Sequence, residues 1–510
     1  MTYLCAPIFV RDIDQARRDI NAAIAEGAEM IELRVDELND SAVLDAILKE
    51  KKRPIIVTCR PTWEGGKSTA SDLDRANLLA HATENGADYI DFEMKAVAET
   101  GLNVFHDTGR VILSSHDFNG RPEKLYNVVA DMNRQPVHVN KIAWTSRSIR
   151  DNVEALELLH QRSRPTIALC MGEAGAVSRI LAKKFGAFLT FASLNTESAT
   201  APGQISLAEM KGLYRWDKIR RETKVYGVVA HPVGHSMSPA IHNAAFDATN
   251  YDGIYVPLLV QPGYESFKAF METFVPFAPL DLCGLSVTLP HKENALRYLQ
   301  EQGATVEELA ARIGAVNTII IDRSGAVPKL SGINTDYAAI LDSITEALGC
   351  ERKDLAALSA AVLGAGGTGR TAVAALSHYG AKVELYNRTP EKAAALAEEF
   401  PGVVCRPWDK LADSDCSVYI NATSVGMHPK VAESPFGDHP PRLRPESIVF
   451  DTIYNPIQTR LISQAQAAGA KTISGVEMFV KQAAAQFTGW TRIAAPVDVM
   501  RKIVEQRLQV

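Results

Sequence analysis

Eight short apolar stretches rich in β-branched and aromatic residues recur through the first part of the chain, and they constrain its fold most strongly. They cover residues 4–10, 30–35, 54–59, 89–94, 111–115, 137–144, 166–171 and 188–194. Segments with helical periodicity lie between them, for example residues 13–26, 42–51, 72–85 and 149–161. Strands that alternate with helices indicate a parallel α/β sheet. Eight such units in roughly 200 residues predict a (β/α)₈ TIM barrel, with an open doubly wound sheet as the alternative.

Polar residues at the C-terminal ends of these stretches favour the barrel, because barrel enzymes carry their chemistry on that rim. They are Glu32, Arg34 and Asp36 at the second stretch, Arg60 and Glu64 after the third, Glu93 at the fourth, His116 after the fifth, Lys141 within the sixth, Arg179 after the seventh, and Thr200 and Gln204 after the eighth. One charged residue at a strand end is usually a structural ion pair. Successive strands that each contribute to one rim predict a binding site.

The second half of the chain begins after a polar, highly charged stretch at residues 211–224. Expected strands at 225–230, 254–259, 285–289 and 316–321 form one α/β lobe, and a new βαβ unit starts at Ala360. The tail from 479 to 510 is expected to be helical and to pack back on the first of these lobes. The sequence therefore predicts domains at 1–218, at 224–335 together with 475–510, and at 336–474.

Composition excludes several classes of protein. Lys and Arg number 54 against 60 Asp and Glu, a net charge of −6 that argues against a nucleic-acid binder. No apolar run reaches the ~18 residues of a membrane span, and the N-terminal stretch lacks the basic start of a signal or transit segment. Seven scattered cysteines without ligand spacing are typical of reduced thiols, so we expect a cytoplasmic protein with no metal site and no obligatory protein partner.

Lys141 lies within the apolar stretch Val139-Asn-Lys-Ile-Ala-Trp144. A desolvated lysine loses proton affinity and becomes a nucleophilic amine that can form a Schiff base with a ketone. His116 could transfer protons near neutral pH, and Glu64 could orient it. Three arginines, Arg34, Arg60 and Arg179, are suited to bind carboxylate. Together these residues predict a site for a small anionic keto acid, although a strand lysine or a lone histidine by itself more often has a structural role.

The same residues belong to motifs that resemble type I 3-dehydroquinate dehydratase over nearly all of residues 1–215. The motifs are Glu32-Leu-Arg34-Val-Asp36, Cys59-Arg60-Pro-Thr-Trp-Glu64-Gly-Gly66, Asp91-Phe-Glu93, Ser115-His116-Asp117-Phe118, Lys141-Ile142, Ser178-Arg179 and Ala201-Pro-Gly-Gln204. The resemblance implies that Lys141 forms the imine, that His116 is the general acid/base and that Glu64 positions it. It also implies that Glu32, Arg34, Arg60, Arg179, Thr200 and Gln204 bind substrate. Thr200 stands where the family commonly has Ser, and the hydroxyl is kept.

A glycine-rich sequence, Ala361-Val-Leu-Gly364-Ala365-Gly366-Gly367-Thr368-Gly369, follows an expected strand and precedes an expected helix. In that context it predicts a dinucleotide site with the pyrophosphate at the helix N-terminus. Asn387, Arg388 and Thr389 follow the next strand, about 20 residues after the first glycine, where an NAD enzyme places an acidic residue. The basic Arg388 instead favours the 2′-phosphate of NADP, unless it merely caps a loop.

The lobe before this sequence carries polar residues that suit a polyhydroxylated acid. They stand in Gly234-His-Ser236-Met-Ser238-Pro239, Ser286-Val-Thr288-Leu-Pro-His-Lys292, Ala315-Val-Asn317-Thr318 and Gly332-Ile-Asn334-Thr335-Asp336. Lys292 and Asp336 could form an acid/base pair that protonates an alkoxide as hydride arrives. Taken singly, serines before a proline and asparagines in loops are commonly turn formers.

Jointly these motifs resemble shikimate dehydrogenase across about residues 224–510. The remaining matches are Asn421-Ala-Thr423-Ser-Val-Gly426-Met427, Tyr454-Asn-Pro456 and Gly475-Val-Glu-Met478-Phe-Val-Lys-Gln482. The resemblance implies substrate contacts by Ser236, Ser238, Thr288, Asn317, Asp336, Tyr454 and Gln482, and catalysis by Lys292 and Asp336. It implies cofactor contacts by Gly364, Ala365, Gly366, Gly367, Thr368, Gly369, Asn387, Arg388, Thr389, Thr423 and Met478. Retention of both Ser238 and Thr288 favours shikimate over quinate.

The two resemblances imply consecutive reactions, since the product of the first is the substrate of the second. We therefore expect a bifunctional shikimate-pathway enzyme of aromatic amino-acid biosynthesis, similar to the fused dehydratase–dehydrogenase of plants. Its partners would be 3-dehydroquinate, 3-dehydroshikimate, shikimate and NADP(H), without nucleic acid or membrane. The alternatives are another Schiff-base lyase, such as an aldolase, fused to a quinate or hydroxy-acid dehydrogenase, and a catalytically inactive ligand sensor built on these folds.

Overall fold

The computed structural model describes residues 2–38, 40–194 and 204–508. It divides into two compact units, Met1–Pro239 with Asp252–Leu282, and Ala240–Tyr251 with Cys283–Val510. No helix within the described ranges is long and apolar enough to cross a membrane.

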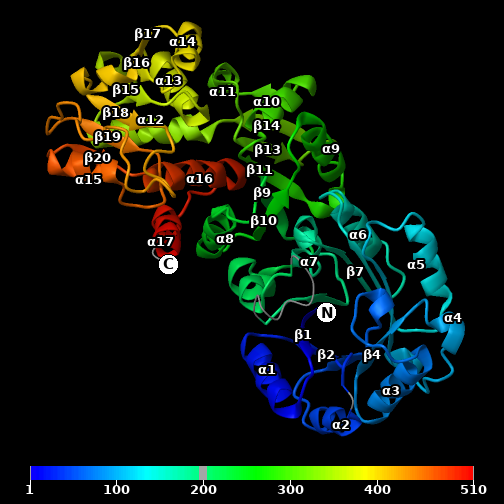
Figure 1. Cartoon of the computed structure of the whole chain (residues 1–510). Helices are drawn as coiled ribbons and strands as arrows, with labels where there is room; N and C mark the ends of the chain where they lie inside the picture. Colours follow the sequence, from blue (N-terminus) through cyan, green and yellow to red (C-terminus); the bar gives the residue numbers. More distant parts are fainter. Residues whose placement is uncertain (1, 39, 195–203, 509–510) are drawn as a thin grey trace. The chain divides into compact units, whose positions relative to one another are not determined.

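A parallel eight-stranded sheet in the first unit confirms the predicted barrel (Figure 1). Its strands are β1 (Tyr3–Phe9), β2 (Met30–Arg34), β3 (Ile55–Thr58), β4 (Tyr89–Glu93), β5 (Val111–Asp117), β6 (Val139–Thr145), β7 (Thr166–Met171) and β8 (Leu189–Phe191). They run in the order β7-β6-β5-β4-β3-β2-β1-β8. The Phe188 amide donates to the Thr166 carbonyl at 2.9 Å, which joins the two ends of the sheet.

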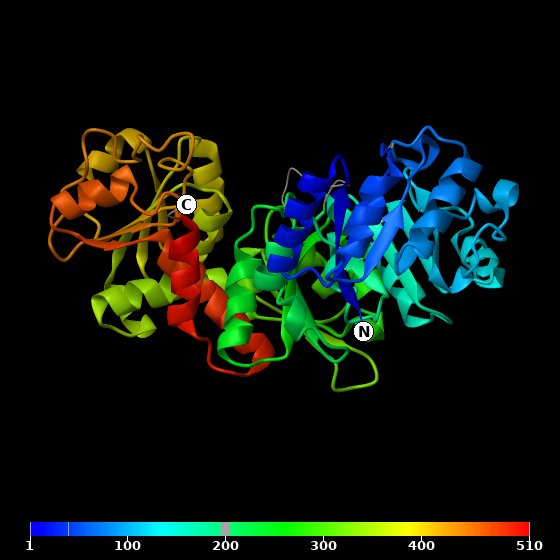
Figure 2. The same ribbon diagram turned by 90° about the horizontal axis from the view of Figure 1, so that it is seen from below.

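Helices connect these strands and lie outside them, as the blue to cyan ribbons of Figures 1 and 2 show. They are α1 (Ile13–Ala25), α2 (Ser41–Lys49), α3 (Asp72–Glu84), α4 (Val97–Thr100), α5 (Leu125–Arg134), α6 (Asp151–His160) and α7 (Ala176–Ile180). Side chains at their N-termini cap several of them; the Asp12 carboxylate, for example, accepts the Gln15 amide of α1. Because buried parallel strands need apolar side chains on both faces, the strands are largely apolar, as Ile55-Ile-Val-Thr58 of β3 illustrates.

The charged stretch after the barrel is packed rather than extended. Trp216 is fully buried there. The Lys184 ammonium, next to the barrel's last strand, donates to the carbonyls of Arg221 and Thr223 at 2.7 and 2.8 Å. The chain then enters β9 (Lys224–Ala230), which pairs in parallel with β10 (Gly253–Leu259), and α9 (Tyr264–Phe274) completes this part of the first unit. Most of α8 (Ser238–Ala248) belongs to the second unit. The chain thus stays bound to the barrel up to the start of β9.

The second unit contains a mixed ladder and a parallel sheet. The ladder joins β11 (Leu282–Val287), β13 (Thr318–Asp322), β14 (Lys329–Ile333) and β12 (Thr305–Val306), with α10 (Lys292–Glu301), α11 (Glu308–Ile313) and α12 (Thr335–Leu348). The parallel sheet contains β15 (Ser359–Leu363), β16 (Lys382–Tyr386), β17 (Val403–Arg406), β18 (Val418–Asn421), β19 (Ile448–Asp451) and β20 (Lys471–Ile473). The strands lie in the order β17-β16-β15-β18-β19-β20. The chain first adds strands on one side of β15 and then crosses to add the rest on the other side, which is the strand order of a Rossmann fold.

Side chains that alternate along the parallel strands form two cores, one on each face of this sheet. Val362 and Ile420 belong to the core beneath α12 and α13 (Gly367–His378), and α14 (Pro390–Glu399) packs on the same side. Leu363 and Tyr419 belong to the core under α15 (Arg460–Ala467). The C-terminal helices α16 (Gly475–Thr491) and α17 (Val497–Leu508) confirm the predicted helical tail, and the Trp490 indole of α16 donates to the Ile319 carbonyl of β13.

Candidate functional site

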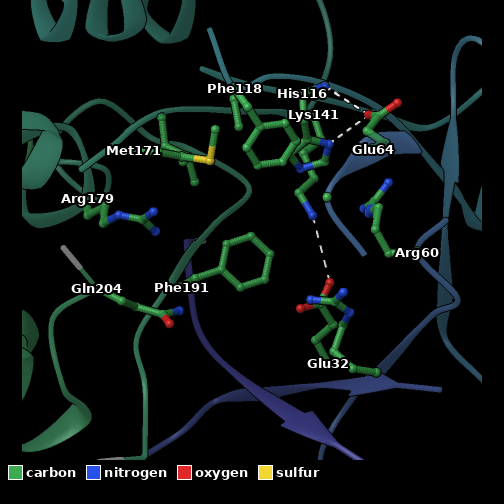
Figure 3. Close-up of a pocket in the computed structure, with 14 residues that line it drawn as sticks. Glu32, Arg60, Glu64, His116, Phe118, Lys141, Met171, Arg179, Phe191 and Gln204 are labelled. Atoms are coloured by element: carbon green, nitrogen blue, oxygen red, sulfur yellow. Dashed lines mark hydrogen bonds and ion pairs between the residues drawn. The ribbon is translucent and has the colours of Figure 1, made fainter. Parts of the chain in front are cut away.

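A pocket of about 600 Å³ opens at the C-terminal ends of the barrel strands (Figure 3). Its lining is Glu32, Arg34, Arg60, Glu64, Gly65, His116, Phe118, Lys141, Ala143, Leu169, Met171, Arg179, Phe191 and Gln204. The structure therefore brings together the barrel residues that the sequence predicted for catalysis and substrate binding, except Thr200, which lies outside the described residues. Asp36 and Glu93, expected on the same rim, do not line the pocket. The prediction did not include the apolar walls, formed by Phe118, Met171 and Phe191 among others.

Lys141 lies in the middle of β6, and its side chain points into the barrel. Its ammonium donates to the Asp91 carboxylate at 2.7 Å and lies 3.7 Å from the Glu32 carboxylate. It also lies 4.7 Å from the centre of the Phe191 ring, and the residue is 5% exposed. The Lys141 ammonium thus lies between two carboxylates and the Phe191 ring, at the edge of the pocket.

His116 belongs to β5 itself, although the sequence placed it after the strand. Its Nδ1 is 2.8 Å from Glu64 Oε1, which also accepts the His116 backbone amide at 2.9 Å. These two contacts fix the ring, so Nε2 is the nitrogen that serves the pocket. Glu64 is presented by a tight turn in which Gly65 has φ +76°, and a Cβ there would lie 2.3 Å from the Phe118 ring. Only glycine fits this turn without displacing Phe118.

Burial sets the protonation of this pair. It raises the pKa of Glu64 to about 7, against the lowering effect of the nearby Arg60 guanidinium. Burial also lowers the pKa of His116 well below its usual value, and the cations Arg60 and Lys141 lower it further. The imidazole is therefore neutral at neutral pH, as a general base requires.

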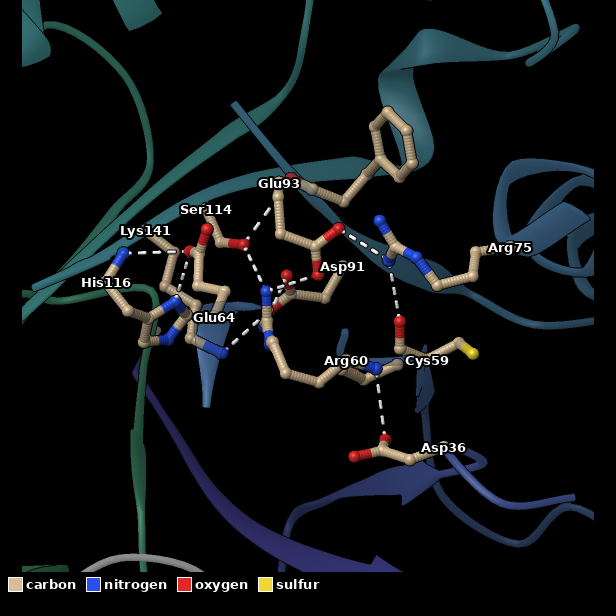
Figure 4. Close-up of polar contacts among 12 residues, drawn as sticks. Asp36, Cys59, Arg60, Glu64, Arg75, Asp91, Glu93, Ser114, His116 and Lys141 are labelled. Carbon is tan, nitrogen blue, oxygen red and sulfur yellow. Dashed lines mark hydrogen bonds and ion pairs between the residues drawn. The ribbon is translucent and has the colours of Figure 1, made fainter. Parts of the chain in front are cut away.

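The three arginines of the pocket differ in their partners. Arg34 makes two hydrogen bonds to Asp36, at 3.1 and 2.6 Å. Arg60 is 5% exposed in its side chain and contacts Asp91 and Glu93, each at 2.7 Å (Figure 4). Arg179 is 2% exposed and, within the described residues, has no ion pair and no hydrogen bond at Nε.

Arg179 is consequently the pocket arginine whose positive charge no described carboxylate balances, so it is available to bind an anionic ligand. Burial lowers its pKa only to about 10, so it stays protonated at neutral pH. An unpaired buried cation is costly, and a ligand carboxylate would offset that cost. This arrangement indicates an anionic ligand at the Arg179 side of the pocket.

A second set of predicted residues meets in the second unit, where α10 and α12 begin. Lys292 Nζ donates to Asp336 Oδ2 at 2.6 Å, and both side chains are partly exposed. The Asn334 side chain caps α12 by accepting the Asp336 amide at 3.0 Å. Asn317 Oδ1 accepts the Thr335 amide at 2.8 Å. Both hydrogen bonds hold the start of α12 and so position Asp336, which in turn contacts Lys292 at the start of α10.

The other residues predicted for this substrate are placed as follows. Ser236 and Ser238 belong to the first unit, where the Ser238 amide donates to Ser236 Oγ at 3.3 Å. Thr288 follows β11 in the second unit and is partly exposed. Tyr454 stacks on Phe479 of α16, with ring centres 5.1 Å apart, and Gln482 lies on the same helix.

Gln486, one turn beyond Gln482, is a residue that the sequence analysis missed. Its amide accepts from Ser286 Oγ at 2.8 Å and donates to Thr318 Oγ1 at 3.0 Å. Thr318 Oγ1 in turn donates to Asn317 Oδ1 at 2.7 Å. The sequence could have indicated Gln486, because it lies at helical spacing from Gln482 and therefore on the same face of the expected helix.

The glycine-rich turn lies between β15 and α13, as predicted. Gly364 has φ +109°, and a Cβ there would lie 2.9 Å from the Ala422 carbonyl oxygen. A Cβ on Gly369 would lie 1.9 Å from the Gly364 carbonyl oxygen, whereas Gly366 and Gly367 face open space. The turn thus leaves room for a ligand at the N-terminus of a helix, where backbone amides favour phosphate.

The loop after β16 supplies the predicted specificity residues. Asn387 Oδ1 accepts the Ala365 amide at 3.1 Å, which joins this loop to the glycine-rich turn. Arg388 and Thr389 are exposed, and no ion pair holds Arg388 within the ranges that the structure describes. A free guanidinium at this position suits a 2′-phosphate, so the residues present fit NADP. Among the described residues no cluster of His, Cys, Asp and Glu could hold a metal ion.

Comparison with known proteins relates the whole chain to one type of enzyme. It is 36% identical over 522 aligned residues to the bifunctional 3-dehydroquinate dehydratase/shikimate dehydrogenase, chloroplastic, of Arabidopsis thaliana, covering 99% of this chain and 84% of that protein. The chain belongs to the bifunctional 3-dehydroquinate dehydratase/shikimate dehydrogenase family. Family models divide the bifunctional chain. Type I 3-dehydroquinase matches 4–221, the shikimate dehydrogenase substrate binding domain 228–319, shikimate/quinate 5-dehydrogenase 348–435, and the shikimate 5'-dehydrogenase C-terminal domain 475–505.

Relatives of the second half of the bifunctional chain exist as separate proteins. A shikimate dehydrogenase (NADP(+)) of Moorella thermoacetica is 37% identical over 302 residues, covering 57% of this chain and 96% of that protein. A crystal structure of a shikimate dehydrogenase in complex with NADP⁺ has a TM-score of 0.50 and 33% identity, covering 57% of this chain and 97% of that chain.

Proposed function

We propose that the chain converts 3-dehydroquinate to 3-dehydroshikimate in its barrel and reduces that product to shikimate with NADPH in its second half. The observation that carries the proposal is the meeting in one pocket of Lys141, His116 and Arg179, the last of which has no ion pair with any described residue. An amine, a neutral imidazole and a free guanidinium are what a keto acid needs to be captured, deprotonated and held. Membership of the bifunctional family supports the pairing of the two reactions.

In the proposed dehydratase step, Lys141 Nζ bonds to the substrate ketone carbon, and the carbonyl oxygen leaves as water. The resulting iminium draws electrons from the neighbouring carbon, so a proton too weakly acidic in the ketone becomes removable. His116 Nε2 takes that proton and later delivers one to the β-hydroxyl, which leaves as water. A water then hydrolyses the iminium, which breaks the C–N bond, restores the ketone and frees Lys141. Glu64 holds the ring, and Arg179 would bind the carboxylate. Glu32, Arg34, Arg60, Thr200 and Gln204 would bind the hydroxyls.

In the proposed reduction, NADPH supplies hydride when it is bound. Lys292 donates a proton to the alkoxide oxygen of the product, and Asp336 positions Lys292 and binds the neighbouring hydroxyl. The glycine-rich turn from Gly364 to Gly369 would hold the pyrophosphate. Asn387, Arg388 and Thr389 would hold the adenosine 2′-phosphate. Further substrate contacts would come from Ser236, Ser238, Thr288, Asn317, Tyr454 and Gln482, and further cofactor contacts from Thr423 and Met478.

The domain limits that belong to this proposal are 1–218 for the dehydratase, 224–335 with 475–510 for the shikimate-binding lobe, and 336–474 for the NADP-binding lobe. The ranges matched by the four family models support them. We also propose that the enzyme works in the cytoplasm with small-molecule partners alone. The seven unpaired cysteines support a reducing compartment.

The decisive experiment supplies purified chain with 3-dehydroquinate and NADPH and identifies the products by mass spectrometry. We expect shikimate to accumulate with one NADPH consumed per molecule, and 3-dehydroshikimate alone to accumulate when NADPH is omitted. NADH in place of NADPH should give slower reduction because it lacks the phosphate that Arg388 would bind. Failure to form the conjugated enone in any mixture would refute the proposal, and so would cleavage of a carbon–carbon bond.

The Glu64–His116 pair predicts how the dehydratase depends on pH. Below pH 7 the protonated Glu64 donates to Nδ1, which leaves the ring hydrogen on Nε2 and removes the base. As pH rises through about 7, Glu64 ionises and accepts Nδ1–H, and Nε2 becomes free to take a proton. We therefore expect kcat/KM for 3-dehydroquinate to rise with pH through about 7.

The measurement is kcat/KM from enone absorbance over a pH series in wild type and Glu64→Gln. Glutamine accepts Nδ1–H without titrating, so its acid limb should move to lower pH, because burial depresses the pKa of His116. The rate of 3-dehydroshikimate reduction in each sample reports that the variant is intact. An unchanged limb near pH 7 in Glu64→Gln would show that another group controls it.

A further inference from the structure

Asp91 is a buried carboxylate of the barrel to which the mechanism above assigns no role. It lies on β4, paired with Thr58 of β3 and Ile112 of β5, and is 1% exposed. Glu93 lies two residues further on the same strand, so both carboxylates point into the barrel. Figure 4 shows the two with Arg60, Arg75 and Lys141.

The two carboxylates have different partners. Asp91 Oδ2 accepts from Lys141 Nζ at 2.7 Å, and Oδ1 lies 2.7 Å from Arg60 Nη2. Glu93 pairs with Arg60 and with the fully buried Arg75 of α3, each at 2.7 Å. Among the described residues, Asp91 is the carboxylate closest to the reactive nitrogen, since Glu32 lies 3.7 Å away.

The charge of Asp91 is permanent. Burial alone would raise the pKa of this carboxyl, but Arg60 and Lys141 outweigh burial and hold its pKa well below the usual range. Oδ1 of the carboxylate forms an ion pair with Arg60 but accepts no hydrogen bond among the described residues, while Oδ2 accepts from Nζ. The Lys141 nitrogen thus meets an oriented, ionised group that does not itself line the pocket.

We propose that Asp91 is a catalytic counter-ion, which holds Lys141 Nζ in position and balances its positive charge from ammonium to iminium. The inference rests on the proposed dehydratase function. Overall, R–NH₃⁺ and the ketone R₂C=O give R–NH⁺=CR₂ and water. One C–N σ bond and one C–N π bond replace the C=O bond, and the departing oxygen takes two protons from nitrogen. Lys141 attacks as the free amine after a proton leaves its nitrogen, and the nitrogen regains its +1 charge as the C–N bond forms. A fixed carboxylate at 2.7 Å stabilises this developing cation.

Glu93 offers a matched control. It shares the strand, the burial and the Arg60 partner with Asp91, but within the described part of the chain it has no hydrogen bond or ion pair with Lys141 and instead pairs with Arg75. If Asp91 only held Arg60, then Asp91→Asn and Glu93→Gln should impair the enzyme alike. If Asp91 acts on the nitrogen, the Asp91 variant alone should lose imine formation.

The experiment compares wild type, Asp91→Asn, Asp91→Glu and Glu93→Gln in the full chain. Each is mixed with 3-dehydroquinate and borohydride for a series of times, and the covalent mass gain on Lys141 is followed together with kcat. We expect Asp91→Asn to slow trapping and lower kcat by on the order of 10²-fold. Glu93→Gln should trap at a rate within a few-fold of wild type. Asp91→Glu, which keeps the charge, should recover at least about tenfold of the loss.

Each outcome decides the matter. Trapping by Asp91→Asn as fast as wild type, or losses equal to those of Glu93→Gln, would overturn the inference. Absence of trapping in wild type would instead refute the proposed dehydratase function. Reduction of 3-dehydroshikimate by the same samples and circular dichroism report folding. Should Asp91→Asn not fold, Asp91→Glu carries the test, and a folded Glu variant as inactive as Lys141→Ala would overturn the inference.

Discussion

Replacement of Lys141 by alanine is expected to abolish dehydration of 3-dehydroquinate, by on the order of 10⁴-fold or more in kcat, and to leave the reduction of 3-dehydroshikimate intact. Without the amine no iminium forms, and the imidazole of His116 must act on an unactivated ketone. The pocket would keep its arginines, so substrate should still bind. The measurement is enone formation, with NADPH oxidation on added 3-dehydroshikimate as the internal reference.

Borohydride trapping identifies the nitrogen directly. Wild type should gain the mass of reduced substrate on the peptide that contains Lys141, and Lys141→Ala should gain none. Lys124→Ala removes an exposed lysine of the same barrel and serves as the matched control, with trapping and kcat expected at wild-type levels. Loss of both activities in Lys141→Ala, or mass gain on another lysine, would contradict the assignment.

Replacement of Lys292 by alanine should have the converse effect, with kcat for reduction lowered by on the order of 10²–10⁴-fold and dehydration unchanged. The alkoxide then lacks its proton donor, although the cofactor turn is untouched. 3-Dehydroshikimate should accumulate from 3-dehydroquinate even with excess NADPH. The KM for NADPH should stay near its wild-type value, because Lys292 lies outside the glycine-rich turn.

The 2.6 Å contact between Lys292 and Asp336 also predicts how their replacements combine. Residues that act as one unit have strongly non-additive effects, so Lys292→Ala with Asp336→Asn should cost little more than the worse single change. Lys353→Ala, which removes an exposed lysine of the same unit, is the control. Additive losses would indicate that the two side chains act separately.

Much of the fold could be predicted because the barrel strands are apolar and evenly spaced. The stretch predicted at 166–171 coincides with β7, Thr166–Met171, and the strand from Lys382 to Tyr386 was also found as expected. β14 was missed because Lys329-Leu-Ser-Gly-Ile333 contains too few β-forming residues to be distinguished from a loop. Its backbone pairs with β13, and such pairing is set by tertiary contact rather than by local sequence.

The members of the barrel site could be predicted, but their partners could not. Arg34, Arg60 and Arg179 are equivalent in sequence. Only the structure distinguishes Arg34 and Arg60, which form ion pairs, from Arg179, which forms none with the residues that are described. Ion pairing depends on which strands are neighbours and on the depth of each side chain. The signal that was available for Asp91 and Glu93 was two acids at alternate positions of a buried strand, which is rare unless both are paired.

The packing of Trp216 and Lys184 at the end of the barrel determines where the two halves of this chain can be separated for independent expression. A stop codon placed directly after β8 would remove Trp216 and expose the apolar surface that its indole covers. A truncation that retains everything up to Thr223 keeps the carbonyls that receive the Lys184 ammonium. The segment that follows the barrel is therefore a packed part of the barrel domain and not merely a flexible linker.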